Sequence, residues 1–175
     1  MRYSQGFTLV ELLVVIGVAG ILLSIAVPSF APFMGDQAAR GVAQHLMSDM
    51  VYARGEAARH NRRVQLTPIS GDWENGWQVT RVDDGMVLRT QSAVPDNISV
   101  CIASAALAGA IQFGSDGRLV RDFGGGTDSL LVGWLGESGD ADNRVRRIRI
   151  NMAGRPVINV QPVGSAFVDD GGNAC

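Results

Sequence analysis

The stretch Gly6-Phe7-Thr8-Leu9-Val10-Glu11, followed directly by Leu12-Leu13-Val14-Val15-Ile16, decides the fold of this chain. It places one carboxylate at the head of a long apolar segment, because the residues from Leu12 to Gly35 include no charged side chain. A helix needs roughly 20 apolar residues to cross a bilayer, and this segment is longer. The sequence therefore predicts a long N-terminal helix whose first half spans a membrane.

The residues before this segment do not have the form of a secretory signal peptide. Such a peptide is cleaved after its apolar core, whereas here a short leader with Arg2 ends at Gly6, before the apolar run begins. Cleavage after Gly6 would keep the helix in the mature protein. Glu11 would then need a cationic partner, because a lone carboxylate inside a bilayer is costly. The alternative is an ordinary anchor in which Glu11 reaches the membrane interface.

The order Gly-Phe-Thr-Leu-x-Glu ahead of an apolar helix resembles the class III leader of type IV pilins and type II secretion pseudopilins. The resemblance implies that a prepilin peptidase cleaves between Gly6 and Phe7 and that Phe7 becomes N-methylated. It implies that Glu11 neutralises the amine of a neighbouring subunit in a filament. It also implies a single-pass protein of the inner membrane, with its C-terminal domain in the periplasm.

Composition limits the rest of the chain to one further domain. The 175 residues are 46% apolar and carry a formal net charge of −2, which suits one membrane helix and one globular domain. All basic residues apart from the two histidines are arginines, and the near-neutral balance gives no general attraction to nucleic acid. We expect a leader at 1–6, a membrane or filament-core helix at 7–35, an amphipathic helix at 36–61 and a β-rich periplasmic domain at 62–175.

The pattern after the apolar segment predicts an α+β fold of pilin-like form. Apolar residues recur at alternating steps of four and three and should pack on a sheet: Ala39, Ala43, Leu46, Met50, Ala53 and Ala57. Pro28 should kink or locally unwind the helix before them. Beyond Asn61 short runs alternate with turns, which predicts a mainly antiparallel sheet with strands at 64–67, 77–82, 86–90, 98–102, 111–113, 119–120, 130–134, 145–150 and 157–160.

Four blocks in this region narrow the resemblance to the GspH/FimT family: Tyr52–Val64, Trp73–Trp77, Phe113–Gly117 and Ile150–Arg155. Membership implies a minor type IV pilin that joins a tip or priming complex and initiates pilus assembly. Its partners would be other minor pilins or pseudopilins, the major pilin, the prepilin peptidase and the inner-membrane assembly platform. The alternative within the family is a minor pseudopilin at the tip of a type II secretion pseudopilus.

A third interpretation is a DNA-binding minor pilin for natural transformation. Family members with this role resemble the chain and carry a C-terminal Gly-Arg-x-Arg motif, of which Gly154-Arg155-Pro156-Val157 keeps only the first arginine. Arginines pair well with phosphate, and the nearby candidates are Arg144, Arg146, Arg147 and Arg149. Strand alternation, however, sends Arg146 and Arg147 to opposite faces, so DNA contact is not the favoured function.

The remaining reactive residues predict no enzyme, no cofactor and no metal site. The two cysteines, Cys101 and Cys175, are a candidate disulfide that would pin the C-terminal tail to a strand in an oxidising compartment; two unrelated thiols are the alternative. Asp140-Ala141-Asp142-Asn143 lacks the full spacing and the later glutamate of a calcium loop. The predicted function is therefore interaction with other subunits.

Overall fold

The computed structural model describes residues 7–29, 31–102, 109–120, 128–134 and 145–160. The chain divides into two compact units, residues 1–34 and residues 35–175. Each unit is described by itself.

The first unit contains helix α1, Leu9–Ser29, in which every described side chain is exposed. Thr8 caps the helix, because its Oγ1 accepts a hydrogen bond from the N–H of Glu11 at 3.2 Å and its carbonyl accepts one from Leu12 at 3.2 Å. Across the described residues, no helix combines the length and the hydropathy needed to cross a membrane.

Helix α2, Ala31–His60, carries the predicted apolar stripe into the core of the second unit. The six stripe residues are completely buried: Ala39, Ala43, Leu46, Met50, Ala53 and Ala57. Asn61 ends the helix in the left-handed conformation with φ 51°, and the N–H of Arg62 donates to the carbonyl of Ala57 at 3.1 Å. This is the hydrogen-bond pattern of a Schellman C-cap, so the chain turns sharply into the first strand.

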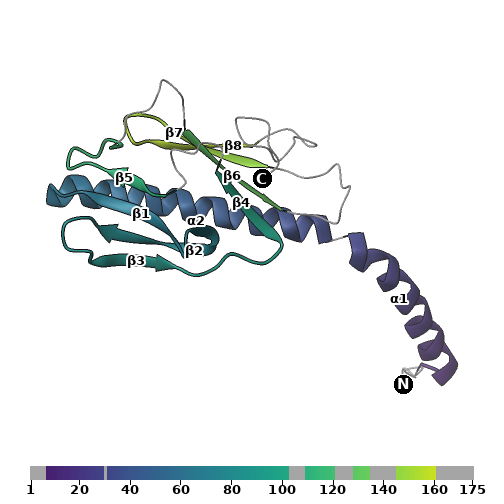
Figure 1. Ribbon diagram of the computed structural model, residues 1–175. Coiled ribbons are helices and arrows are strands. Elements are labelled where there is room, and N and C mark those ends of the chain that lie inside the picture. The colour runs from purple at the N-terminus through teal and green to yellow at the C-terminus, as the bar shows by residue number, and fades with distance from the viewer. Residues whose placement is uncertain (1–6, 30, 103–108, 121–127, 135–144, 161–175) are drawn as a thin grey trace, which may run out of the picture. The chain divides into compact units, whose positions relative to one another are not determined.

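Two four-stranded sheets pack against the buried face of α2 in the second unit (Figure 1). The first has the order β3-β2-β1-β5 and the second the order β4-β6-β7-β8, with antiparallel pairing at every described ladder. The bounds of the first sheet are β1 Val64–Ile69, β2 Asp72–Arg81, β3 Val87–Gln91 and β5 Ile111–Phe113. Those of the second are β4 Ile98–Ile102, β6 Asp128–Trp134, β7 Arg146–Ile150 and β8 Pro156–Val160.

The core joins the stripe of α2 to both sheets. Among its buried residues are Leu66 of β1, Val79 of β2, Ile98 of β4 and Ile148 of β7. A long helix packed on antiparallel sheet confirms the predicted pilin-like α+β class.

The main differences between the structure and the sequence prediction concern the number of sheets, residues 119–120 and the start of β2. The β-rich part forms two sheets rather than one, and residues 119–120 do not form a strand: Leu119 makes an isolated bridge to Phe113. Strand β2 begins at Asp72, five residues before the predicted start at Trp77. The pairing with β1 is irregular here: Pro68 pairs with Trp77, and the next residue, Ile69, pairs with Asp72. This bulge interrupts the alternation, so the sequence pattern does not reveal the first part of the strand.

Candidate functional site

The predicted processing segment lies at the start of the first unit. Phe7 is 84% exposed, whereas Gly6, the predicted cleavage position, lies outside the described residues. Glu11 is exposed in the first turn of α1, three residues after the capping Thr8. The unpaired N–H groups of a helix start favour a carboxylate at this position. The cap therefore holds Glu11 one turn from the helix N-terminus.

The predicted DNA-contact arginines are not gathered on one exposed face. In β7 the core-facing residues are Arg146, Ile148 and Ile150, so the predicted alternation places Arg146 inward. Arg146 Nη2 donates to Asp36 Oδ1 of α2 at 2.8 Å. Arg147 is half-buried and Arg149 is exposed on the opposite face, while Arg144 lies outside the described residues. Because Arg146 is engaged in a buried ion pair, it is not available to a phosphate.

Arg155 instead belongs to a pair of equivalent turns that the sequence did not connect. In each turn the N–H of the first residue donates to the carbonyl of the fifth: Gly114 to Arg118 at 2.7 Å, and Asn151 to Arg155 at 3.3 Å. In each, a glycine precedes the final arginine and has a positive φ, 71° at Gly117 and 70° at Gly154. This is the three-residue hairpin loop with a left-handed glycine, so both turns end in a buried glycine followed by an exposed arginine.

The two turns touch through their glycines. A Cβ on Gly154 would lie 2.6 Å from the carbonyl oxygen of Gly117, so only glycine allows this approach. The same oxygen accepts a hydrogen bond from Nε of Arg54 in α2 at 2.9 Å. Asp116 and Asn151 are used within the turns, since their side chains accept the N–H groups of Arg118 and Arg155. The contact brings two exposed arginines, from different sheets, to one end of the second unit.

The signal for this arrangement was present in the sequence but incomplete. The dipeptides Gly117-Arg118 and Gly154-Arg155 each lie between two predicted strands. No local pattern indicates that turns from different parts of the chain meet. Arg118 and Arg54 were therefore absent from the predicted set.

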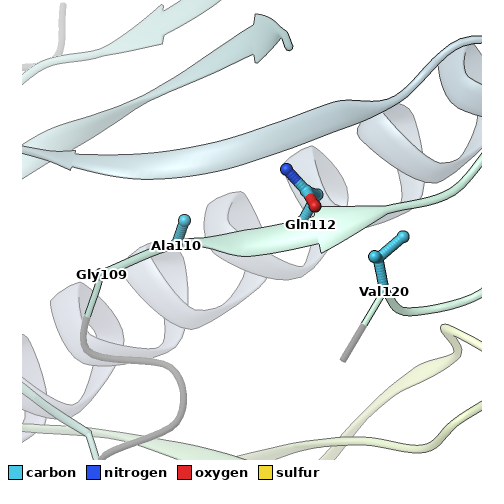
Figure 2. Close-up of a pocket in the computed structure, with 4 residues that line it drawn as sticks. All are labelled: Gly109, Ala110, Gln112 and Val120. Carbon is cyan, nitrogen blue, oxygen red and sulfur yellow. The ribbon is translucent and has the colours of Figure 1, made fainter. Parts of the chain in front are cut away.

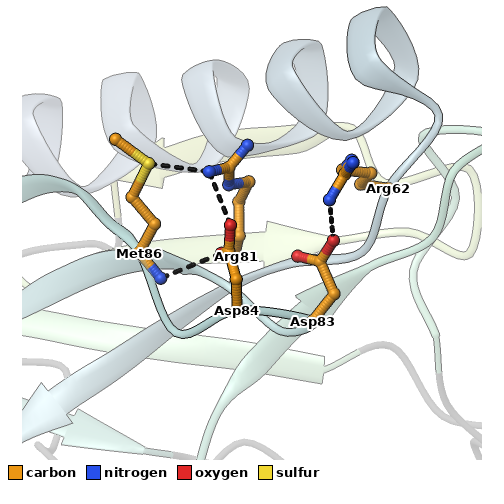
Figure 3. A network of polar contacts seen from close by, with 5 residues as sticks. All are labelled: Arg62, Arg81, Asp83, Asp84 and Met86. Atoms are coloured by element: carbon orange, nitrogen blue, oxygen red, sulfur yellow. Dashed lines mark hydrogen bonds and ion pairs between the residues drawn. The ribbon is translucent and has the colours of Figure 1, made fainter.

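A second charged group surrounds the turn between β2 and β3 (Figure 3). Arg62 forms a hydrogen-bonded ion pair with Asp83, and Arg81 pairs with Asp84 at 2.6 Å and contacts Met86 Sδ at 2.7 Å. Desolvation acts to raise the pKa of Asp83. The hydrogen bond and charge of Arg62, with backbone N–H groups, outweigh it and hold that pKa below its ordinary value. Each of the two arginines is thus paired with an aspartate of the turn.

The described hollows offer little to a small-molecule ligand. Figure 2 shows one of about 300 Å³ beside β5, whose described lining residues are uncharged: Gly109, Ala110, Gln112 and Val120. Another, of about 250 Å³, has Asp72, Glu74 and Asp96 in its lining. Glu74 is already engaged there, because its Oε1 accepts hydrogen bonds from Ser99 Oγ and the N–H of Val100. In the described parts of the chain, no three His, Cys, Asp or Glu residues come together as metal ligands.

The cysteine prediction stays a prediction. Cys101 lies in β4 opposite Leu131 of β6 in the strand register. Cys175, and the acidic stretch 140–143, lie outside the described residues.

The fold, a long helix packed on antiparallel sheets, is that of a pilin-type subunit. Residues 1–27 match the prokaryotic N-terminal methylation motif, and residues 42–154 match the family described as type II transport protein GspH. The second match covers more than half of the chain. The protein belongs to the GspH family, a family of structural subunits and not of enzymes.

Solved structures and a curated relative agree with this class. The chain resembles two crystal structures of the type IV minor pilin FimU of Pseudomonas aeruginosa. The first has a TM-score of 0.56 at 20% identity over 76% of this chain and 95% of that one. The second has a TM-score of 0.51 at 21% identity over 72% and 94%. At this identity the likeness shows the fold alone.

One curated relative matches over a shorter region. The pilin-like protein PilA1 of Thermus thermophilus is 44% identical over 64 residues, which is 35% of this chain. The match spans only 38% of the length of that relative.

Proposed function

We propose that the chain is a minor type IV pilin that joins a tip or priming complex and helps to initiate pilus assembly. The observation that carries the proposal is the combination of a methylation motif at residues 1–27 with a GspH domain whose fold covers 95% of the minor pilin FimU. In this function the leader is cleaved after Gly6 and Phe7 becomes the methylated N-terminus. The apolar segment then holds the subunit in the inner membrane until assembly.

The described geometry of α1 supports a role for Glu11 in recruitment. Its carboxylate is exposed in the first helical turn, close to the position of the new amine. In an apolar environment it gains most from a cation, and the methylated amine of a neighbouring subunit supplies one. The partners are accordingly other minor pilins, the major pilin, the prepilin peptidase and the inner-membrane assembly platform.

The amount of pili that can be sheared from the cell surface tests the proposal. A clean deletion should lose pili and the restored gene should return them. Glu11→Ala should give a folded protein that fails to restore pili, whereas Asp96→Ala, an exposed carboxylate of the second unit, should restore them. Gly6→Val should block processing and leave only the longer form on a gel. Normal pili in the deletion strain, with loss of exported enzymes, would favour the pseudopilin alternative.

A second candidate, DNA contact during uptake, is favoured by the touching Gly-Arg turns. Arg118 and Arg155 are both exposed there, beside Arg54 of α2, and supply the paired arginines that residues 154–157 alone lack. Binding of a labelled duplex to the purified full chain should weaken when both arginines become glutamine. The slope of log affinity against log salt should fall by about one for each arginine removed. Arg40→Gln, an exposed arginine near the start of α2 and outside the predicted set, is the matched control. Equal binding by the double variant and wild type would exclude these turns.

A further inference from the structure

The geometry points to the Asp36–Arg146 ion pair as the clamp that fixes where α2 becomes part of the globular unit and limits how far the helix can unwind during assembly. The part of the inference that concerns assembly rests on the proposed function. The effect of the ion pair on the helix can be measured whether or not that function is correct.

The arginine of this pair is unusually buried for its type. The side chain of Arg146 is 6% exposed, and that of Asp36 is 22% exposed. The neighbours of Arg146 in the strand register are Val132 of β6 and Val160 of β8, both apolar. Its Nη1 is buried without a hydrogen-bond partner among the described residues. Asp36 is therefore the counter-ion that makes burial of this charge tolerable.

The pair lies at the first point where α2 engages the second unit. Ahead of it Phe33 and Met34 are 58% and 65% exposed. The compact unit begins at Gly35, and the completely buried stripe starts one turn later at Ala39. Asp36 is thus the first described side chain of α2 with a hydrogen bond or ion pair to a strand.

The helix around Asp36 is intrinsically weak. Gly35 and Gly41 stand on either side of it, and glycine is less favourable in a helix than alanine. Pro28 and Pro32 precede it, and each removes a backbone donor. Unwinding that starts at the prolines would meet no strong local resistance until it reached a tertiary contact. The Asp36–Arg146 pair is the first polar contact of this kind among the described residues.

An ion pair suits this role better than an apolar contact. The hydrophobic effect is non-directional, so an apolar contact alone favours one register less strongly. A buried arginine cannot leave its carboxylate without becoming an uncompensated charge, so the clamp has one favoured register. The helix before Asp36 can therefore change while the helix after it keeps its place on the sheets.

Hydrogen exchange of the full chain in detergent micelles, read by mass spectrometry, tests the clamp. Asp36→Asn keeps the shape of the side chain and removes its charge. We expect exchange of the amides from 35 to 41 to accelerate by about tenfold or more, while the amides from 46 to 57 keep their wild-type rates. The exchanged pair, Asp36→Arg with Arg146→Asp, should recover most of the lost protection.

The matched control is Asp49→Asn, which weakens another ion pair of the same helix, with Arg89, deeper in the unit. Its effect should fall on the amides from 46 to 57 and not on those from 35 to 41. Unchanged exchange at 35–41 in Asp36→Asn would overturn the clamp, as would equal acceleration along all of α2, which would indicate global destabilisation.

Surface pili supply the second readout in a strain whose pili require the gene. Cells that carry Asp36→Asn should lose pili, and cells that carry Asp36→Arg with Arg146→Asp should regain them. Full piliation of the Asp36→Asn strain, despite accelerated amide exchange in that variant, would overturn the link to assembly. If the deletion strain itself has normal pili, the proposed function fails, while the exchange measurement still decides the clamp.

Discussion

Asp49 of α2 accepts a hydrogen bond from the indole N–H of Trp77 in β2, with 2.8 Å between Oδ2 and Nε1. The other oxygen of the same carboxylate accepts a hydrogen bond from Arg89 of β3 at 2.6 Å. The guanidinium of Arg89 also lies 4.2 Å from the centre of the Tyr52 ring. One buried carboxylate thus fixes the helix to two adjacent strands, and it serves packing and not catalysis.

Replacing this carboxylate should cost stability. In Asp49→Ala the indole N–H of Trp77 stays buried without an acceptor, which costs about 2 kcal/mol. For a chain of this size the melting temperature should fall by roughly 4–8 °C. Circular dichroism melts of the full chain in detergent measure it. Asp96→Ala, an exposed carboxylate, should melt within about 1 °C of wild type. Equal melting of both variants would show that Asp49 does not hold the helix to the sheet.

Gly76→Ala should be among the most damaging single substitutions in β2. Gly76 has φ +95°, and a Cβ there would lie 2.2 Å from the backbone oxygen of Gln91. The β2–β3 pairing would have to separate to admit the methyl group. Gly85→Ala is the matched control, because Gly85 has φ +68° but open space around it. It should lose about 1–2 kcal/mol from backbone strain alone.

Urea denaturation of the two alanine variants distinguishes the cost of backbone strain from the cost of a steric clash with β3. We expect Gly76→Ala to lose at least about twice the free energy of unfolding lost by Gly85→Ala, or to fail to fold. Equal midpoints would mean that the bulge at residues 73–76 accommodates a side chain by local movement.

The parts of the fold that were predictable are those with a local signal. The apolar period of α2 is evident from Ala39, Leu46, Met50 and their neighbours, because an amphipathic helix buries every third or fourth residue. The positions of three hairpin turns followed from the gaps between predicted strands, where Gly85, Gly117 and Gly154 each adopt a positive φ. In both cases the signal lies within a few neighbouring residues of the sequence.

The parts that were missed depend on pairing across the chain. Alternation does not say that β5 pairs with β1 and β6 with β4, which is what divides the strands into two sheets. The Asp36–Arg146 pair joins residues 110 positions apart, and strand alternation separated Arg146 from Arg147 without indicating which of them faces inward or what it pairs with. Arg118 was missed for the same reason, because its neighbour Arg155 comes from a different sheet.

The Arg62–Asp83 pair predicts a measurable pH dependence. The pKa of Asp83 is held below its ordinary value, so the pair stabilises the fold fully above the unfolded pKa of about 3.9. That stabilisation is lost as the pH falls through the lower, folded pKa. Arg62→Gln removes the hydrogen bond and charge of Arg62 and should raise the pKa of Asp83. Carboxyl carbon shifts in an NMR titration report it directly.

Arg63→Gln is the control for this titration, because Arg63 is an exposed neighbour that makes no described contact with Asp83. It should leave the midpoint of Asp83 in place. The same midpoint in Arg62→Gln as in wild type would mean that the ion pair does not persist in solution.

Thr8 should control the order of the first turn of α1. Its Oγ1 accepts the N–H of Glu11, and an N-cap of this kind contributes about 1 kcal/mol. After the proposed cleavage Thr8 is the second residue of the chain, so little else holds that turn. Thr8→Ala should therefore speed exchange of the Glu11 amide by about fivefold. Thr8→Ser keeps the oxygen and should exchange as wild type does. Equal exchange in the alanine and serine variants would show that the hydroxyl does not cap the helix; a selective effect of alanine would identify Thr8 as the residue that holds Glu11 in place for a neighbouring amine.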